Sequence, residues 1–176
     1  LIPTHMEPLS AKMREMGYTV DEDDESIRVY KEDDAEIEGT NFKTAPYPGF
    51  PTDLQPQAVV LLCLAKGLSK MHENVWETRF QYVPELIRMG ANINTIERVA
   101  LVSGVDKLKP ANVGATDLRA GAALVCAALS AEGTSYIAHA SKIDRGYENI
   151  CEKLTALGAT IERVEGLEYE HEDQEV

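Results

Sequence analysis

Cysteine, basic residues and long apolar runs are all scarce in this sequence. Its three cysteines, Cys63, Cys126 and Cys151, are odd in number and form no C-x-x-C pair, so they support neither a disulfide framework nor a zinc site. No apolar run approaches the roughly 20 residues of a spanning helix, and the first residues lack a signal-peptide pattern. We therefore predict a cytoplasmic protein that does not enter the membrane.

The balance of charge excludes a second group of partners. Seventeen Lys and Arg stand against thirty Asp and Glu, and the formal net charge is −13. Such a charge opposes binding to nucleic-acid phosphates or to anionic lipid. The acidic residues concentrate in three runs, at 21–25, 32–38 and 165–175, which are typical of solvated loops or termini. Neither nucleic acid nor a membrane is an expected partner.

Two similar segments begin with Thr-Asp-Leu, at Thr52 and at Thr116, sixty-four residues apart. Their apolar residues recur at helical spacing, at Leu54, Ala58, Leu61, Leu62 and Ala65 in the first copy and at Leu118, Ala122, Val125, Cys126 and Leu129 in the second. The pattern predicts two amphipathic helices that begin just after Thr-Asp and end near Gly67 and Gly133. The cysteines occupy apolar helix positions, where we expect core rather than a nucleophile.

A second unit recurs three times, each time as a short amphipathic helix, a glycine and an extended segment. The glycines are Gly17, Gly90 and Gly158, which suit a left-handed helix cap. Extended segments are also expected at 27–30, 100–105 and 135–140. The predicted order is strand, helix, strand, helix, strand, strand, which is an α/β fold built from repeats.

The short helix has three copies and the long helix has two, so the first repeat lacks its opening half. A repeat unit buries its apolar face against a neighbour, and a free-standing protein would rarely begin within one. We therefore expect residues 1–176 to be one incomplete domain, truncated at its N-terminus, of a longer polypeptide.

The repeated aspartates, Asp53 and Asp117, are candidate functional groups. A carboxylate at a helix start is favoured by the helix dipole and the free N–H groups, so each aspartate is equally well explained as a cap. Their duplication at equivalent positions of the repeat makes a role in a site as good an interpretation. The sequence alone leaves both open.

Arginines near predicted helix starts are the second hint of a site. Arg119 stands where the first copy has Gln55, Arg145 precedes a short helix, and Arg79 lies near the equivalent position one repeat earlier. A cation at a helix start is unfavourable unless an anion offsets it. The alternative is a salt bridge to a neighbour, which for Arg145 means Asp144 or Glu148.

Four segments in order carry a resemblance to a known family: PYPGFPTDLQPQ, RMGANI, ATDLRAGAALV and IDRGYENICEKLTALGA. They resemble the UDP-N-acetylglucosamine 1-carboxyvinyltransferases, the enolpyruvyl transferases of peptidoglycan synthesis in cell wall biogenesis. The resemblance covers nearly the whole chain. It implies two domains, each of three β-α-β-α-β-β units in an inside-out barrel, of which this chain is the C-terminal part.

The resemblance also implies a reaction, in which a sugar hydroxyl of UDP-N-acetylglucosamine adds to phosphoenolpyruvate in the cleft between domains and phosphate leaves. For this chain it implies that Asp53 contacts the sugar and acts as general base. The implied substrate-binding residues are Asp53, Val75, Arg79, Asp117, Leu118, Arg119 and Arg145. No cofactor and no metal are implied.

In the resembled family, the general acid lies on a loop of the other domain, and none of the three cysteines here matches that loop. The chain alone is therefore expected to be inactive, and the missing N-terminal part of the same polypeptide is an expected partner. Two other interpretations stay open. One is the shikimate-pathway enolpyruvyl transferase, which shares the repeat. The other is a non-catalytic regulatory or interaction domain on the same repeat.

Overall fold

The computed structural model describes residues 2–165, so the acidic run predicted at 165–175 lies outside the described residues except for Glu165. The helices are η1 (Pro3–His5), α1 (Glu7–Glu15), η2 (Thr52–Leu54), α2 (Gln55–Cys63), α3 (Val83–Arg88), α4 (Leu118–Ser130), α5 (Ser141–Asp144) and α6 (Ile150–Ala156). The strands are β1 (Thr19–Glu22), β2 (Ile27–Tyr30), β3 (Asn41–Lys43), β4 (Leu68–His72), β5 (Asn92–Ile96), β6 (Val99–Ser103), β7 (Asn112–Gly114) and β8 (Tyr136–Ala138).

The predicted repeat is present, and its second unit shows every element. This unit runs β3, α2, β4, α3, β5, β6 and forms one sheet in the order β3-β4-β6-β5. Strands β3 and β4 are parallel, and the other two pairs are antiparallel. The first unit contributes α1 and the β1–β2 hairpin, and the third contributes β7, α4, β8 and α6. That residues 1–176 form one incomplete domain stays a prediction.

The glycine positions confirm the predicted ends of the short helices. Gly17, Gly90 and Gly158 follow α1, α3 and α6 with φ of 101°, 88° and 97°. This left-handed conformation is strained for residues with a Cβ atom, which explains the glycine in all three units. The long helices end earlier than predicted, at Cys63 and Ser130, so Gly67 and Gly133 lie in the turns that follow.

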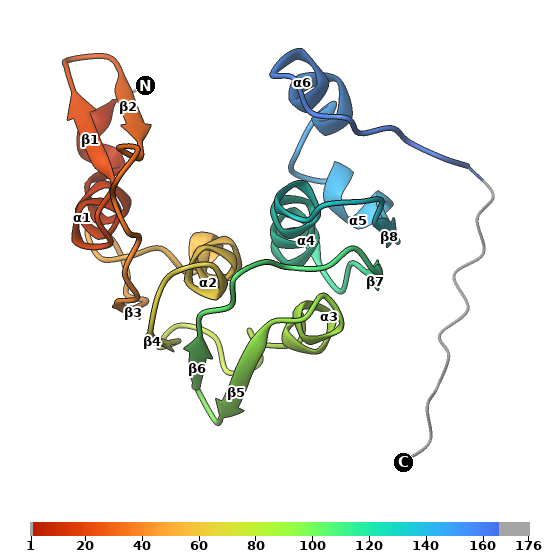
Figure 1. Ribbon diagram of the computed structural model, residues 1–176, viewed down its shortest axis with the longest axis horizontal. Coiled ribbons are helices and arrows are strands. Elements are labelled where there is room, and N and C mark those ends of the chain that lie inside the picture. The colour runs from red at the N-terminus through yellow and green to blue at the C-terminus, as the bar shows by residue number, and fades with distance from the viewer. Residues whose placement is uncertain (1, 166–176) are drawn as a thin grey trace.

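Helices α2 and α4 pack against each other near the centre of the molecule, with the four-stranded sheet and the β7–β8 pair beside them, while the β1–β2 hairpin lies with α1 at one edge (Figure 1). The prediction of an amphipathic α2 is wrong, because its residues are buried on nearly every side. A helix that is covered on all faces needs no polar stripe.

For α4 the predicted face is also wrong in part. Helix α4 buries Ala123, Leu124 and Ala127, whereas Cys126 and Leu129 are exposed. Helices α2 and α5 both pack against α4, and the glycine at Gly121 allows Ile143 of α5 to approach α4 closely. Of the cysteines, only Cys63 is buried, and burial raises its pKa to about 12.

Within residues 2–165, no helix combines the length and apolar composition needed to cross a bilayer. The same residues contain no group of three or more His, Cys, Asp or Glu side chains that could hold a metal ion. The cytoplasmic location stays a prediction.

Gly104, in the turn after β6, packs directly against the backbone of the segment that follows α2. A Cβ atom at Gly104 would lie 1.7 Å from the carbonyl oxygen of Ala65, just past the end of α2. Gly104→Ala must therefore move backbone, and we expect it to lower the free energy of unfolding by about 3 kcal/mol. Denaturant unfolding of both forms measures the loss.

The matched control is Gly146→Ala, whose Cβ would meet the end of the Leu118 side chain at 2.8 Å. A side-chain end can rotate away, so this loss should be clearly smaller than that at Gly104. Equal losses would contradict the assignment of Gly104 to a backbone contact.

Candidate functional site

Asp53 lies in η2, immediately before α2, and its side chain does not cap that helix. The start of α2 shows no side-chain cap hydrogen bond. Instead the Asp53 carboxylate accepts a hydrogen bond from Nε of Arg119 in the first turn of α4. The Asp53 side chain is 62% exposed, so its second oxygen is accessible from solvent. The cap interpretation of Asp53 is therefore wrong.

Asp117, the equivalent aspartate one repeat later, is a cap. Its Oδ1 accepts hydrogen bonds from the backbone N–H groups of Arg119 at 2.7 Å and Ala120 at 3.0 Å. The two aspartates therefore do different things, although the sequence places them at equivalent positions. Asp117 caps the start of α4, whereas Asp53 accepts a hydrogen bond from the Arg119 side chain of that helix.

Arg119 meets the requirement for an anion near its helix start. The hydrogen bond to Asp53 is the largest cause of a raised pKa for Arg119, and the charge of Asp117 adds to it. The partner is a carboxylate sixty-six residues away in the sequence rather than a neighbour. Asp53, Asp117 and Arg119 thus form one charged cluster at the N-terminal ends of α2 and α4.

Arg145 does not stand at a helix start, and this part of the prediction is wrong. It is the C-terminal cap residue of α5, where a cation is favourable to the helix dipole. The alternative salt bridges are not found among the described residues either, because Asp144 pairs with Arg163 and Glu148 with Lys153. Arg145 is exposed and forms no ion pair with any residue from 2 to 165.

Close backbone packing brings the Arg145 segment to the start of α4. A Cβ atom on Gly146 would lie 2.8 Å from Cδ2 of Leu118, and one on Gly121 would lie 2.4 Å from Cγ1 of Ile143. In addition, Nε2 of Gln57 in α2 donates a hydrogen bond to the hydroxyl of Tyr147 at 3.1 Å. Leu118 and Arg145 therefore lie beside the charged cluster.

Val75 and Arg79 lie on the turn that follows β4. The Val75 backbone N–H donates to Oε1 of Glu73 at 2.8 Å, which leaves its carbonyl as the backbone group for any ligand. The Arg79 guanidinium lies over the exposed Trp76 ring, 5.6 Å from its centroid. Nε of Arg79 is buried and has no hydrogen-bond partner among the described residues.

Glu73 was missed by the sequence analysis. Its side chain is fully buried and links the Val75 turn to Thr52, the residue before Asp53. A Glu-x-Val spacing has no recognisable signal by itself, since the partners come from three separate segments.

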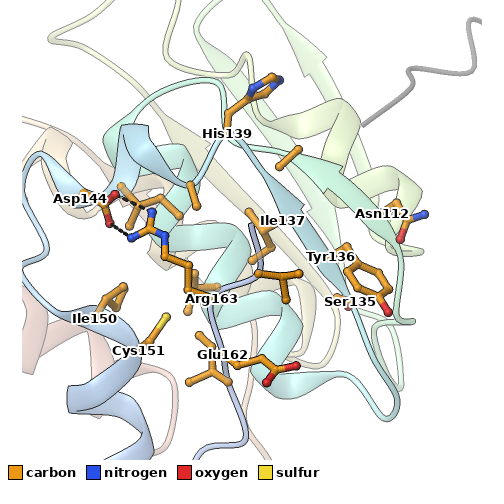
Figure 2. Close-up of a pocket in the computed structure, with 16 residues that line it drawn as sticks. Asn112, Ser135, Tyr136, Ile137, His139, Asp144, Ile150, Cys151, Glu162 and Arg163 are labelled. Atoms are coloured by element: carbon orange, nitrogen blue, oxygen red, sulfur yellow. Dashed lines mark hydrogen bonds and ion pairs between the residues drawn. The ribbon is translucent and has the colours of Figure 1, made fainter. Parts of the chain in front are cut away.

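A cavity of about 420 Å³ lies elsewhere, beside β8, α5 and the segment 161–164. Figure 2 shows the Asp144–Arg163 pair on its wall, with Cys151 and Ile150 nearby. None of the predicted site residues lines it. The cavity is thus separate from the charged cluster of Asp53, Asp117 and Arg119.

Comparison with known proteins finds similarity to carboxyvinyltransferases. The model of the EPSP synthase family (3-phosphoshikimate 1-carboxyvinyltransferase) matches residues 3–154. UDP-N-acetylglucosamine 1-carboxyvinyltransferase 2 of Clostridium acetobutylicum is 50% identical over 163 residues, which are 93% of this chain and 38% of that protein. The protein named UDP-N-acetylglucosamine 1-carboxyvinyltransferase of Desulfofundulus thermocisternus is also 50% identical, over 66% of its length.

Solved structures agree on the fold. The enolpyruvyl transferase NikO from Streptomyces tendae superimposes with a TM-score of 0.80 at 29% identity, over 88% of this chain and 36% of that one. EPSP synthase from Acinetobacter baumannii gives a TM-score of 0.52 at 16% identity, over 70% of this chain and 30% of that one, and supports the fold alone. The chain thus spans well under half the length of most of these relatives.

Proposed function

The chain belongs to the EPSP synthase family, and from this premise we propose that it is the C-terminal part of a UDP-N-acetylglucosamine 1-carboxyvinyltransferase. The complete enzyme transfers the enolpyruvyl group of phosphoenolpyruvate to the 3-hydroxyl of UDP-N-acetylglucosamine and releases phosphate. Its N-terminal part supplies the facing domain and the general acid. The product serves peptidoglycan synthesis.

The observation that carries this proposal is the Asp53–Arg119 pair. Asp53 is not used as a helix cap, is mostly exposed and is held at the end of a central helix. A carboxylate in that state can accept a hydrogen bond from the sugar hydroxyl and take its proton as the oxygen attacks. The hydrogen bond from the adjacent Arg119 orients the Asp53 carboxylate.

The remaining residues divide between the two substrates. The Val75 carbonyl contacts the nucleotide sugar, since the N–H of this residue is already bonded to Glu73. Arg145, exposed and without an ion pair among residues 2–165, is suited to the phosphoenolpyruvate anion. Arg79 supplies a further guanidinium for substrate binding. Once the tetrahedral intermediate forms, arginine charge stabilises the departing phosphate.

The acceptor test distinguishes this reaction from its nearest alternative. The complete polypeptide is incubated with phosphoenolpyruvate and either UDP-N-acetylglucosamine or shikimate 3-phosphate, and phosphate release is followed. We expect release with the nucleotide sugar only. Release with shikimate 3-phosphate would favour the shikimate-pathway enzyme, after which the matching family is named. Release with neither would favour a non-catalytic domain.

Arg145→Ala in the complete enzyme is expected to lower kcat/KM for phosphoenolpyruvate by about 10–150-fold, the scale of hydrogen bonds to charged groups. The unfolding midpoint should hardly change, because Arg145 is exposed and carries no ion pair in the described residues. Steady-state kinetics and thermal unfolding are measured side by side.

Arg163→Ala is the matched control, since this exposed arginine pairs with Asp144, the residue before Arg145, and lines the separate cavity. Its kinetics should equal those of the unchanged enzyme. If Arg145→Ala behaves like Arg163→Ala, Arg145 does not bind substrate.

A further inference from the structure

Glu73 carries more contacts than its place in the sequence suggests. Its side chain is 0% exposed, and it accepts four hydrogen bonds. Oε1 accepts from the hydroxyl of Thr44 at 2.7 Å and from the backbone N–H groups of Val75 at 2.8 Å and Trp76 at 3.1 Å. Oε2 accepts from the hydroxyl of Thr52 at 3.0 Å.

No cation forms an ion pair with Glu73 among residues 2–165. Burying a carboxyl group is costly unless hydrogen bonds replace the lost water, and here four neutral donors do so. A buried hydrophobic residue would fill this space at less cost if packing were the whole purpose. The arrangement therefore points to a role beyond filling the core.

The four donors come from three segments that the fold brings together. Thr44 follows β3, Thr52 begins η2 next to Asp53, and Val75 and Trp76 form the turn after β4. Thr44 also accepts a hydrogen bond from the Asn74 backbone N–H at 2.8 Å, which ties the same turn down a second time. One carboxyl group thus fixes the Asp53 segment relative to the Val75 backbone.

We propose that Glu73 is a positioning residue, which sets the distance between the Asp53 carboxylate and the Val75 carbonyl and so orients the acceptor sugar. This inference rests on the proposed function. Asp53 contacts the hydroxyl that reacts, and the Val75 carbonyl holds another part of the same ligand. Their relative position matters because a misplacement of about 1 Å costs on the order of 10²-fold in rate.

The chemistry of the four bonds predicts which substitutions are tolerated. In Glu73→Gln the amide oxygen can take the place of Oε1 and keep the Val75 turn, while the amide nitrogen faces Thr52, whose hydroxyl can turn and accept. In Glu73→Ala all four donors lose their partner. Thr52→Val removes only the link to the Asp53 segment.

The test measures kcat, KM for each substrate and the unfolding midpoint in the complete enzyme. Glu73→Ala should lower kcat/KM for the acceptor by about 100-fold. Thr52→Val should lower it by about 10-fold with little effect on KM for phosphoenolpyruvate. Glu73→Gln should stay within about 3-fold of the unchanged enzyme, because its amide preserves the turn.

Thr40→Val is the matched control. The Thr40 hydroxyl also donates to a glutamate, Glu15, but it lies before β3 and away from the cluster. If Thr52→Val and Thr40→Val have equal kinetics, or if Glu73→Ala only lowers the unfolding midpoint while kcat and acceptor KM are kept, the proposal is overturned. Because Glu73→Ala tests folding as well, Thr52→Val decides the case if the alanine variant does not fold.

A readout that needs no reaction separates this proposal from the proposed function. Amide hydrogen exchange at Val75 and Trp76 in the complete enzyme should speed up in Glu73→Ala and stay slow in Glu73→Gln. Unchanged exchange in Glu73→Ala would overturn the proposal. If exchange responds as expected and the unchanged enzyme does not transfer to UDP-N-acetylglucosamine, the proposed acceptor has failed, and the kinetics are read with the acceptor that is used.

Discussion

Asp53→Asn in the complete enzyme is expected to lower turnover by about 10²–10⁴-fold, the usual contribution of one positioned acid or base. Asparagine has nearly the shape of aspartate but cannot take a proton from the sugar hydroxyl. The fold should stay intact, because the Asp53 side chain is mostly exposed and its ion pair with Arg119 lies at the surface. Exposed pairs contribute about 0–1 kcal/mol. Phosphate release and the unfolding midpoint are measured on the same preparations.

The internal repeat supplies a control at the equivalent position. Asp117→Ala removes a helix cap that accepts two backbone N–H groups, and such a loss costs about 1 kcal/mol. Asp53→Ala removes no cap and should cost less stability than Asp117→Ala. If Asp53→Asn keeps near-normal turnover, Asp53 is not the general base, and the proposed mechanism fails at its first step.

The repeat and the helix ends were predictable from the sequence because they are local. The short helices end at Gly17, Gly90 and Gly158, and each glycine has the left-handed backbone that only a residue without Cβ adopts easily. The extended segment predicted at 27–30 is β2 with the same bounds. Features of this kind depend on a few neighbouring residues, and the threefold pattern repeats the same signal.

The faces of the long helices were not predictable from periodicity. A helix at the centre of three packed units meets protein on several sides, so α2 buries polar Gln55 as well as Val59 and Leu62. The side chain of Gln55 accepts a hydrogen bond from the hydroxyl of Tyr82 at 3.0 Å, which is a contact across the fold. Hydrophobic periodicity detects a helix that has one face in solvent, and α2 has almost no solvent-exposed face.

The differences between the repeats could not be predicted from the sequence either, because they depend on contacts between helices. Asp53 and Asp117 are equivalent in sequence, yet one caps its helix and the other pairs with Arg119 across sixty-six residues. Gln55 occupies the position of Arg119 in the first copy, so the asymmetry begins with a single residue. Its consequence for Asp53 depends on how α2 and α4 meet, which only the packed structure determines.

Arg145 shows where a local argument was applied at the wrong end of a helix. The sequence places it before a predicted helix, but the short α5 intervenes and ends at Asp144, so Arg145 follows a helix C-terminus. The helix dipole favours a cation at this end, so the position of Arg145 no longer requires an anionic partner. What remains is its exposure without an ion pair among residues 2–165, beside the start of α4.

The 176-residue chain by itself is expected to release no detectable phosphate from phosphoenolpyruvate and UDP-N-acetylglucosamine. It spans 38% of the length of a relative with which it shares 50% identity, and we expect the general acid of the proposed reaction in the remainder. Its charged cluster is open to water, with side-chain exposures of 62% for Asp53 and 35% for Arg119. In an open site water competes for the same hydrogen bonds and weakens the electrostatic stabilisation that a closed site supplies.

The measurement compares the purified chain with the complete enzyme at equal molar concentration, using phosphate release over hours. The Asp53→Asn form of the chain runs in parallel, because a trace of contaminating enzyme would release phosphate in both preparations. Release that appears in the unchanged chain and disappears in Asp53→Asn would contradict the prediction. It would mean that the ends of α2 and α4 hold both substrates and move both protons without a facing domain.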